Sequence, residues 1–232
     1  MSKIGIIGAM DLEVDTLKEK MTDVTVITCA RMEFHEGKLN GADVVVVRCG
    51  IGKVNAALCV QILADRFAVT HVINTGVAGS LNAKLDIGDI LVSRDVMHHD
   101  VDVRIFGYPL GEVPQLGVRA FPADPIMAHL ALELCAQVNP DIHAQSGRVV
   151  SGDQFISDMG VKAKLIEEFQ GDCAEMEGAS IAQGAWLNGL PFLVIRAISD
   201  KADGDAGVDY PTFEREAARH SARLVEALAA AL

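Results

Sequence analysis

Short runs of β-branched and other apolar residues recur along this chain and alternate with longer segments of helical periodicity. Such alternation is typical of an α/β fold, in which helices cover both faces of a central sheet. The runs predict buried strands over 3–9, 43–49, 70–76, 88–99, 144–152, 173–176 and 191–200. The periodic segments predict helices over 53–66, 125–138, 160–169, 178–187 and about 211–230, with Asp124 as an N-cap before Pro125 and with Pro211 near the start of the last helix.

Length and composition fit one domain over residues 1–232. No linker, internal repeat or low-complexity tract interrupts the alternation, and 232 residues suit a single large domain. Half of the residues are hydrophobic and only 5% are aromatic, a composition that suits helices packed on a buried sheet.

The negative net charge of the chain indicates which kinds of partner it can bind. With 20 Lys and Arg against 32 Asp and Glu, the formal net charge is −12. Phosphate backbones and anionic lipids would be repelled, so we expect neither nucleic acid nor a membrane as partner. The same acidity would also keep the chain in solution. A neutral or cationic small molecule is the better expectation.

Cysteine spacing and the N-terminal residues indicate the compartment. The five cysteines form no C-x-x-C pair, which argues against a disulfide framework and against a zinc site. The first apolar stretch is too short for a signal peptide, and no apolar run is long enough to span a bilayer. We therefore expect a soluble, cytoplasmic protein.

Acidic residues follow several of the expected strands, where ligands of open α/β sheets bind. Strand 191–200 ends in Ser199 and Asp200. Because burial favours the protonated form of a carboxyl group, Asp200 could act as a general acid, or it could only cap the loop that follows. Glu175 and Glu177 share one side of an extended segment. One of them could bind vicinal hydroxyl groups, or both could belong to a solvated helix start.

Two glycine segments, 50–52 and 76–79, are predicted to be turns after strands. The first has neither the spacing of a P-loop nor the third glycine of a dinucleotide fingerprint, so the sequence does not support a nucleoside triphosphate or NAD site. Both segments could serve as tight turns or allow close approach of the backbone to a ligand.

Other residues give weaker signals. Adjacent strand residues such as His98 and His99 face opposite ways and would not bind one metal ion together. No G-x-S-x-G elbow and no Cys–His pattern marks a nucleophile. Aromatic residues in stretches predicted to be loops could stack on a base, form a lid or simply pack: Phe106, Phe155, Tyr210 and Phe213.

Six motifs occur in a fixed order: GIIGAM, GIGKVNAA, INTGVAG, VSGDQFI, AEMEGASIA and VIRAISD. Together, over about residues 3–230, they resemble the methylthioadenosine/S-adenosylhomocysteine nucleosidases of the nucleoside phosphorylase-like fold. The resemblance implies a three-layer α/β/α domain with a mixed central sheet, working as a homodimer without metal or organic cofactor. It also implies hydrolysis of the N-glycosidic bond of these two nucleosides, with 5′-deoxyadenosine as a further candidate substrate, in methionine salvage.

The resemblance further implies roles for individual residues. Asp200, assisted by Ser199, would protonate the purine at N7, and Glu13 would activate the attacking water. The remaining implied contacts are Met176 and Glu177 at the ribose with Glu175 and Arg196 nearby; Phe155 and Ile156 at the adenine; Met10, Ile51 and Tyr210 at the 5′ group; Ala78 and Gly79 in the pocket wall; and Phe106 and Pro114 from the partner subunit.

Three residues depart from the pattern of the family. Val77 stands where a serine is frequent, which removes a hydroxyl group near the acid. Ser80 replaces a frequent glycine, and Tyr210 replaces a frequent phenylalanine. The tyrosine adds a hydroxyl group at the pocket mouth and could change which 5′ substituent is preferred.

Three rival functions remain. A phosphorylase would need a cationic phosphate site, whereas the first strand is followed by Asp11 and Glu13, and Arg48 is a single cation. An aminofutalosine hydrolase would accept a larger, carboxylated 5′ group. A non-catalytic nucleoside sensor would not need Glu13, Glu177 and Asp200 together.

Overall fold

The strands join into a mixed sheet. The computed structural model describes residues 2–202 and 206–232, apart from the side chains of 207–209. Within these residues lie ten strands: β1 Lys3–Gly8, β2 Thr22–Cys29, β3 Met32–Leu39, β4 Ala42–Arg48, β5 His71–Ser80, β6 Ile90–His98, β7 Phe121–Pro122, β8 Ala144–Ser151, β9 Cys173–Glu175 and β10 Phe192–Asp200. They form one sheet in the order β10-β6-β8-β9-β5-β1-β4-β3-β2, and β7 pairs with β6.

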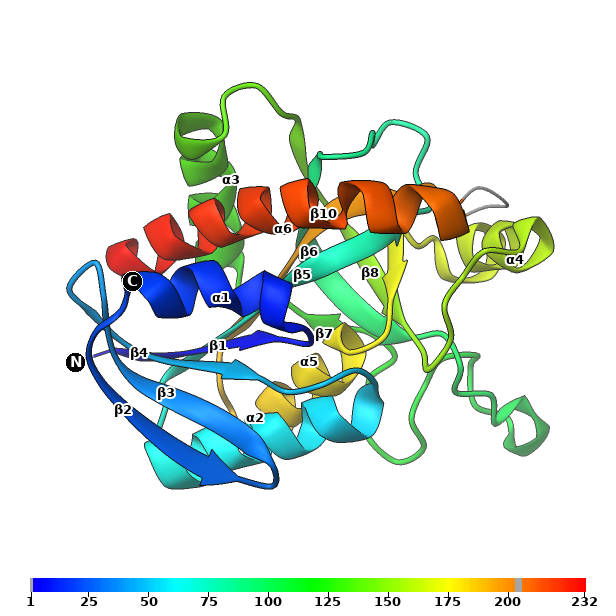
Figure 1. Cartoon of the computed structure of the whole chain (residues 1–232). Coiled ribbons are helices and arrows are strands. Elements are labelled where there is room, and N and C mark those ends of the chain that lie inside the picture. Colours follow the sequence, from blue (N-terminus) through cyan, green and yellow to red (C-terminus); the bar gives the residue numbers. More distant parts are fainter. Residues whose placement is uncertain (1, 203–205) are drawn as a thin grey trace.

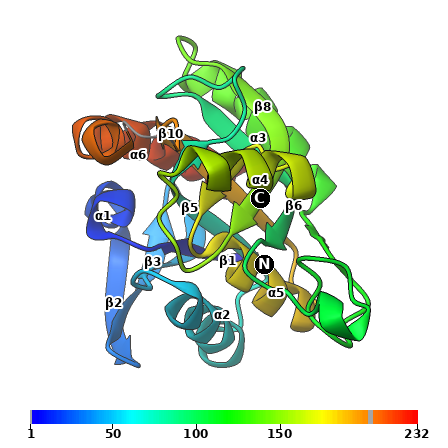
Figure 2. The ribbon, with the colours of Figure 1, turned by 90° about the vertical axis from the view of Figure 1, so that its right-hand side faces the viewer.

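Helices cover both faces of this sheet. They are α1 Asp11–Lys20, α2 Lys53–Phe67, α3 Pro125–Val138, α4 Met159–Phe169, α5 Gly178–Leu187 and α6 Ala206–Ala231, with a short 3₁₀ helix at Arg104–Phe106. Helix α6 packs against α1 and α3 on one side, and α2 packs against α5 on the other (Figure 1). Figure 2, turned by 90°, shows α1 and α6 together on one side of the strands and α2 and α5 together on the other. The expected three-layer α/β/α architecture with a mixed sheet is confirmed.

Strand direction decides which residues meet. Strands β4, β1, β5 and β10 are successive parallel neighbours, so their carboxyl ends lie at one edge of the sheet. Strand β9 runs antiparallel to β5 and parallel to β8. Because β10 pairs with both β5 and β6, the strands β5, β10, β6, β8 and β9 close into a ring. The end of β9 is thereby brought back alongside β5.

Buried apolar strands form the core. All nine residues of β10 are buried, as are nine of the ten residues of β5. Such continuous burial is typical of strands covered on both faces. Helix α3 begins as the sequence predicts, because the Asp124 side chain accepts hydrogen bonds from the backbone N–H groups of Ile126 and Met127, both at 2.9 Å, directly before Pro125.

Two boundary predictions are wrong. The segment 76–79 is not a turn, because β5 continues to Ser80 and pairs there with β10 and β9. Glycine is a frequent strand breaker, but pairing on both sides keeps the chain extended here. The last helix begins at Ala206, so Pro211 lies inside it and Tyr210 and Phe213 lie on a helix, not in a loop. Because proline is frequent in the first turn of a helix, the position of Pro211 led to a predicted start of α6 that is five residues too late.

Candidate active site

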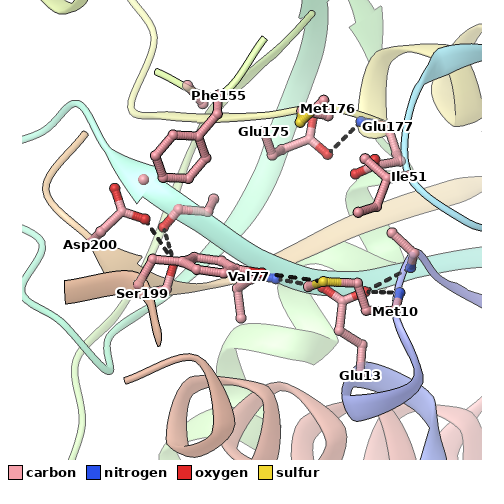
Figure 3. A pocket seen from close by; sticks show the side chains of 15 residues that line it. Met10, Glu13, Ile51, Val77, Phe155, Glu175, Met176, Glu177, Ser199 and Asp200 are labelled. Atoms are coloured by element: carbon pink, nitrogen blue, oxygen red, sulfur yellow. Dashed lines mark hydrogen bonds between the residues drawn. The ribbon is translucent and has the colours of Figure 1, made fainter. Parts of the chain in front are cut away.

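A cavity of about 270 Å³ opens at the shared edge of the parallel strands. Its walls come from the β1–α1 turn, the ends of β5, β9 and β10, the loop after β8 and the first part of α6. Figure 3 shows Asp200 and Phe155 on one side and Glu13, Glu177 and Ile51 on the other. The lining residues are Ala9, Met10, Glu13, Ile51, Val77, Ala78, Gly79, Phe155, Ala174, Glu175, Met176, Glu177, Ser199, Asp200 and Tyr210.

Asp200 is the last residue of β10, and only 2% of it is exposed. One carboxylate oxygen, Oδ2, accepts a hydrogen bond from the Ser199 hydroxyl at 2.9 Å. The other, Oδ1, accepts from the backbone N–H of Ala202 at 2.8 Å. The carboxyl group therefore caps the following turn and also faces the cavity, so both interpretations of Asp200 from the sequence hold geometrically.

Glu13 lies in the first turn of α1 and is 4% exposed. Its Oε2 accepts from the backbone N–H groups of Ala9 at 2.7 Å and Met10 at 3.0 Å, and its Oε1 accepts from that of Val77 at 3.1 Å. The side chain thus joins the start of α1 to β5 and has little freedom. Burial raises the pKa of Glu13, and the charge of Arg196 and the three N–H groups offset that only partly. A rigid carboxylate with a raised pKa is suited to accept a proton from water.

Glu175 lines the cavity, and its carboxylate is held by neighbouring groups of the chain. It accepts hydrogen bonds from the Ser151 hydroxyl and the Arg196 guanidinium, and from the backbone N–H groups of Glu177 and Gly178. Burial raises the pKa of Glu175, but Arg196 and these hydrogen bonds outweigh burial and lower it overall. Glu175 is therefore an ionised anchor for the start of α5 and for Arg196.

Glu177 points across the cavity wall to the turn after β4. Its Oε1 accepts from the backbone N–H of Gly52 at 2.7 Å. Gly50 and Gly52 have φ of +88° and +98°, so this glycine segment is a turn, as predicted. Burial and the negative charge of Glu175 raise the pKa of Glu177 to about 8. Near neutral pH this carboxyl group can hold a proton.

The mouth of the cavity is apolar. The Tyr210 hydroxyl contacts the Met10 sulfur at 3.2 Å, and its ring lies edge-on to Phe155 with centroids 5.8 Å apart. Ile51 is 55% exposed and Phe155 is 52% exposed at this mouth. Helix α6 therefore covers one end of the cavity through Tyr210.

Most of the residues expected at the site surround this cavity. Ile156 lines a smaller adjoining hollow beside Phe155 and Asp200. Arg196 is 2% exposed and lies behind Glu175. Phe106 and Pro114 do not line the cavity within this chain, and Phe106 is 78% exposed. Sequence reasoning missed Ser151 and Asn74, which hold Glu175 and Arg196.

The two adjacent histidines have separate partners. His98 shares a hydrogen bond with Gln183 at 2.9 Å, and His99 packs edge-on against Phe169. Among the residues that the structure describes, no group of three or more His, Cys, Asp or Glu side chains could hold a metal ion. None of the helices described in this structure combines the length and the apolar composition that a membrane span requires.

Known proteins share both the sequence and the fold. Residues 3–230 match the family model of the phosphorylase superfamily. A 5′-methylthioadenosine/S-adenosylhomocysteine nucleosidase of Staphylococcus saprophyticus is 44% identical over 97% of this chain and 98% of its own length. The chain belongs to the methylthioadenosine/S-adenosylhomocysteine nucleosidase family of that superfamily.

Solved structures of nucleosidases agree closely. The enzyme of Neisseria meningitidis, in complex with methylthio-immucillin-A, has a TM-score of 0.96 at 37% identity, with all of both chains covered. The futalosine hydrolase of Helicobacter pylori has a TM-score of 0.94 at 34% identity, with 100% of this chain and 98% of that chain covered. The nucleosidase fold is thus shared by enzymes named for different 5′ groups.

The departures from this nucleosidase family have visible places. The Val77 backbone N–H binds Glu13, and its side chain lines the cavity without a hydroxyl group. The Ser80 hydroxyl donates to the carbonyl oxygen of Asn82 at 2.8 Å and serves the loop after β5. Val77 and Tyr210 both line the cavity, where one removes a hydroxyl group and the other adds one, whereas Ser80 does not line it.

The raised pKa of Glu177 predicts how stability depends on pH. The groups facing this carboxyl are Glu175, Glu13, Arg196 and the N–H of Gly52. The pKa of Glu177 is 4.5 when exposed and about 8 when folded, so its contribution to stability is complete below about pH 4.5 and is lost progressively as the pH rises from there through 8. From pH 6 to 9 the wild type should lose about 2–3 kcal/mol that Glu177→Gln does not lose. Urea unfolding of both proteins at the two pH values measures this difference, and parallel pH dependence would contradict it.

Proposed function

We propose that this protein hydrolyses the N-glycosidic bond of 5′-methylthioadenosine and S-adenosylhomocysteine. Adenine lies between Phe155 and Asp200, with the backbone at Ile156 along its edge. The ribose hydroxyl groups bind Glu177 beside Met176. The 5′ substituent lies against Met10, Ile51 and Tyr210. The opposed positions of Asp200 and Glu13 across one cavity support this orientation.

The reaction needs one proton donor and one proton acceptor. As the C1′–N9 bond breaks, its electron pair moves to the purine, and Asp200 donates a proton to N7. Positive charge that develops on the ribosyl group is stabilised by the carboxylates around it. Water bonds to C1′ and transfers a proton to Glu13, giving adenine and the free 5-thio-substituted ribose. Exchange of one proton with solvent returns both carboxyl groups to their starting states.

The acidity of the cavity favours water over phosphate as nucleophile, and this observation carries the proposal. Four lining residues are acidic and, in the described part of the chain, none that lines the cavity is Lys or Arg. Arg196 is already paired with Glu175, and Arg48 is paired with Asp11 at 3.0 Å. A phosphate dianion would therefore lack the cationic site that it requires.

The test is adenine release from methylthioadenosine in phosphate-free buffer, with and without added phosphate. We expect the same rate in both. A rate that requires phosphate would make the protein a phosphorylase and would remove the role of Glu13 as the base for water. No release under either condition would favour a nucleoside sensor.

A second candidate function is hydrolysis of aminofutalosine, because the futalosine hydrolase of Helicobacter pylori shares this fold. The groups at the mouth of the cavity favour a small thioether, because Met10, Ile51 and Tyr210 offer no cation for a carboxylate. Competition between methylthioadenosine and aminofutalosine ranks the two substrates. Preference for aminofutalosine would replace the proposed substrate but retain the reaction.

We further propose that the protein acts as a homodimer in which Phe106 and Pro114 close the pocket of the partner subunit. Exposed apolar residues support this. Ile51, Val54 and Leu58 on the α2 side are 55%, 71% and 48% exposed, and Phe106 is 78% exposed. Val54 and Leu58 lie one helical turn apart on α2, and an exposed apolar patch is typical of an interaction site.

Subunit mixing tests whether Phe106 acts across the interface. Phe106→Ala should raise KM for methylthioadenosine about 10-fold or more, because burial of a Phe side chain contributes about 1.5–3 kcal/mol. Asp200→Asn inactivates the site of its own subunit. A mixed dimer of the two variants then contains one intact site, so statistical mixing should restore about one quarter of the wild-type kcat/KM. No restoration after subunit exchange would place Phe106 in its own subunit's site or outside both.

We also propose a cytoplasmic location. All five cysteines are unpaired, which suits a reducing compartment.

A further inference from the structure

Two glycines of β5 lie directly beneath the two carboxyl groups to which we assign catalysis. A Cβ atom added at Gly76 would come within 2.7 Å of Glu13 Oε1 and within 3.2 Å of Glu13 Cδ. A Cβ atom added at Gly79 would come within 2.7 Å of Asp200 Oδ1. The two distances of 2.7 Å are far shorter than an ordinary van der Waals contact, so each carboxyl group occupies space that the side chain of any other residue would fill.

Backbone conformation does not explain these glycines. Neither glycine has a positive φ, and both belong to β5 and pair with neighbouring strands. Gly76 pairs with Arg196 of β10, and Gly79 pairs with Asp200 of β10 and Ala174 of β9. Any residue could adopt this extended conformation, and glycine weakens a buried strand. The turn at Gly50 and Gly52 differs, because there φ is positive. The missing side chain, not the flexible backbone, is the relevant property at Gly76 and Gly79.

The contacts at Gly76 belong to the polar cluster that holds the base. Its added Cβ would also lie 3.4 Å from Arg196 Nη1, the cation whose charge acts on Glu13. The next residue, Val77, donates its backbone N–H to Glu13 Oε1. Strand β5 thus binds the Glu13 carboxylate through the backbone N–H of Val77, and the missing side chain of Gly76 leaves the space that this carboxylate occupies.

Gly79 serves the acid in the same way. Asp200 Oδ1 already accepts from Ala202, and an added Cβ at Gly79 would lie 2.9 Å from the Ala202 Cβ as well. The carboxyl group and the turn that it caps would have to move together. Because Gly79 also lines the cavity, such a movement would shift the acid relative to the purine.

We propose that Gly76 and Gly79 are positioning residues, each of which leaves the space in which one carboxyl group of the catalytic pair is held: Glu13 at Gly76 and Asp200 at Gly79. The inference rests on the proposed function for the roles of those carboxyl groups. It assigns the two glycines of the INTGVAG motif a purpose other than a turn.

The kinetic test uses Gly76→Ala and Gly79→Ala with Gly5→Ala as the matched control. Gly5 is a glycine of β1 whose added Cβ would meet only apolar side chains, Leu63 at 3.0 Å and Val69 at 3.4 Å. Displacement of a reacting group by about 1 Å can cost about 10²-fold, so kcat should fall by about that factor in the first two variants. Gly5→Ala should retain wild-type kcat even if its melting temperature falls. A kcat within about threefold of wild type in Gly76→Ala or Gly79→Ala would overturn the assignment for that glycine.

Rescue by a shorter acid separates positioning from general damage. In Gly76→Ala/Glu13→Asp the shorter side chain leaves room for the new methyl group, so the combined loss of kcat should be about tenfold smaller than the product of the single losses. Losses that multiply would contradict the placement. The same cycle on the free energy of unfolding tests the placement without turnover, with Gly79→Ala/Glu13→Asp expected to be additive. If the wild type released no adenine, the proposed function would fail, while the unfolding cycle would still confirm or contradict the Gly76–Glu13 contact.

Discussion

Asp200→Asn is expected to lower adenine release by about 10²–10⁴-fold, the usual contribution of a positioned general acid. Asparagine has nearly the same shape, and its side-chain oxygen can still accept from Ala202, as Asp200 does at 2.8 Å. It has no acidic proton for N7. Nucleoside binding, melting temperature and subunit assembly should therefore remain close to those of the wild type.

Single-turnover kinetics with methylthioadenosine measure this loss. The control is Asp86→Asn, which removes an exposed carboxyl group in the loop between β5 and β6 that pairs with Lys201 at 2.7 Å. It should leave turnover unchanged. Wild-type-like turnover in Asp200→Asn would refute the assignment of the acid.

Glu13→Gln is expected to abolish turnover to a similar degree while nucleoside binding is retained. The amide cannot accept a proton from water at neutral pH. It also meets a second difficulty, because both carboxylate oxygens of Glu13 accept from backbone N–H groups. Either orientation of the amide places its NH₂ group against a donor, which should cost about 1–3 kcal/mol of stability, less the gain from no longer burying a charge.

Calorimetric titration with methylthioadenosine, together with turnover and urea unfolding, separates these effects. Retained binding with lost turnover supports Glu13 as the base. An active Glu13→Gln variant would indicate another base or a phosphorylase-like route. Loss of binding and turnover together would assign Glu13 to substrate contact instead.

The sequence predicted the elements with continuous apolar runs or clear helical periodicity and missed α1, β2, β3 and β7, although α1 and β3 also bury apolar residues. Strand β2, Thr22–Cys29, has no buried residue and was not predicted, although its β-branched residues Val24, Val26 and Ile27 are typical of a strand. Its hairpin with β3 turns at Ala30 and Arg31, whose φ values are +50° and +63°. Such turns usually carry Gly, Asn or Asp, so this one gives no turn signal. Helix α1 begins after Met10, which is not a usual N-cap residue.

The site divides in the same way. Asp200 could be singled out from its place at the end of an apolar strand, because that position is set by one local segment. Glu13 looks like an ordinary acid of a first helical turn, and only the resemblance to the nucleosidase family marked it. Its function depends on Val77, 64 residues away in the chain. The anchoring of Glu175 by Ser151 and Arg196 likewise depends on strand order, which local patterns do not determine.

The ends of the chain lie side by side (Figure 1), and the Ser2 hydroxyl donates to the backbone carbonyl oxygen of Leu232 at 2.9 Å. Strand β1 and helix α6 connect these two ends to the cavity, where Met10 follows β1 and Tyr210 lies on α6. A short peptide could join the two ends without disturbing the sheet, and new ends could be opened at the exposed Asn40–Gly41 turn, where an added Cβ at Gly41 meets nothing within 4 Å. In such a circular permutant, α6 would be followed directly by the β1–α1 segment that carries Glu13. These two parts of the cavity wall could then be exchanged between relatives as one continuous segment of chain.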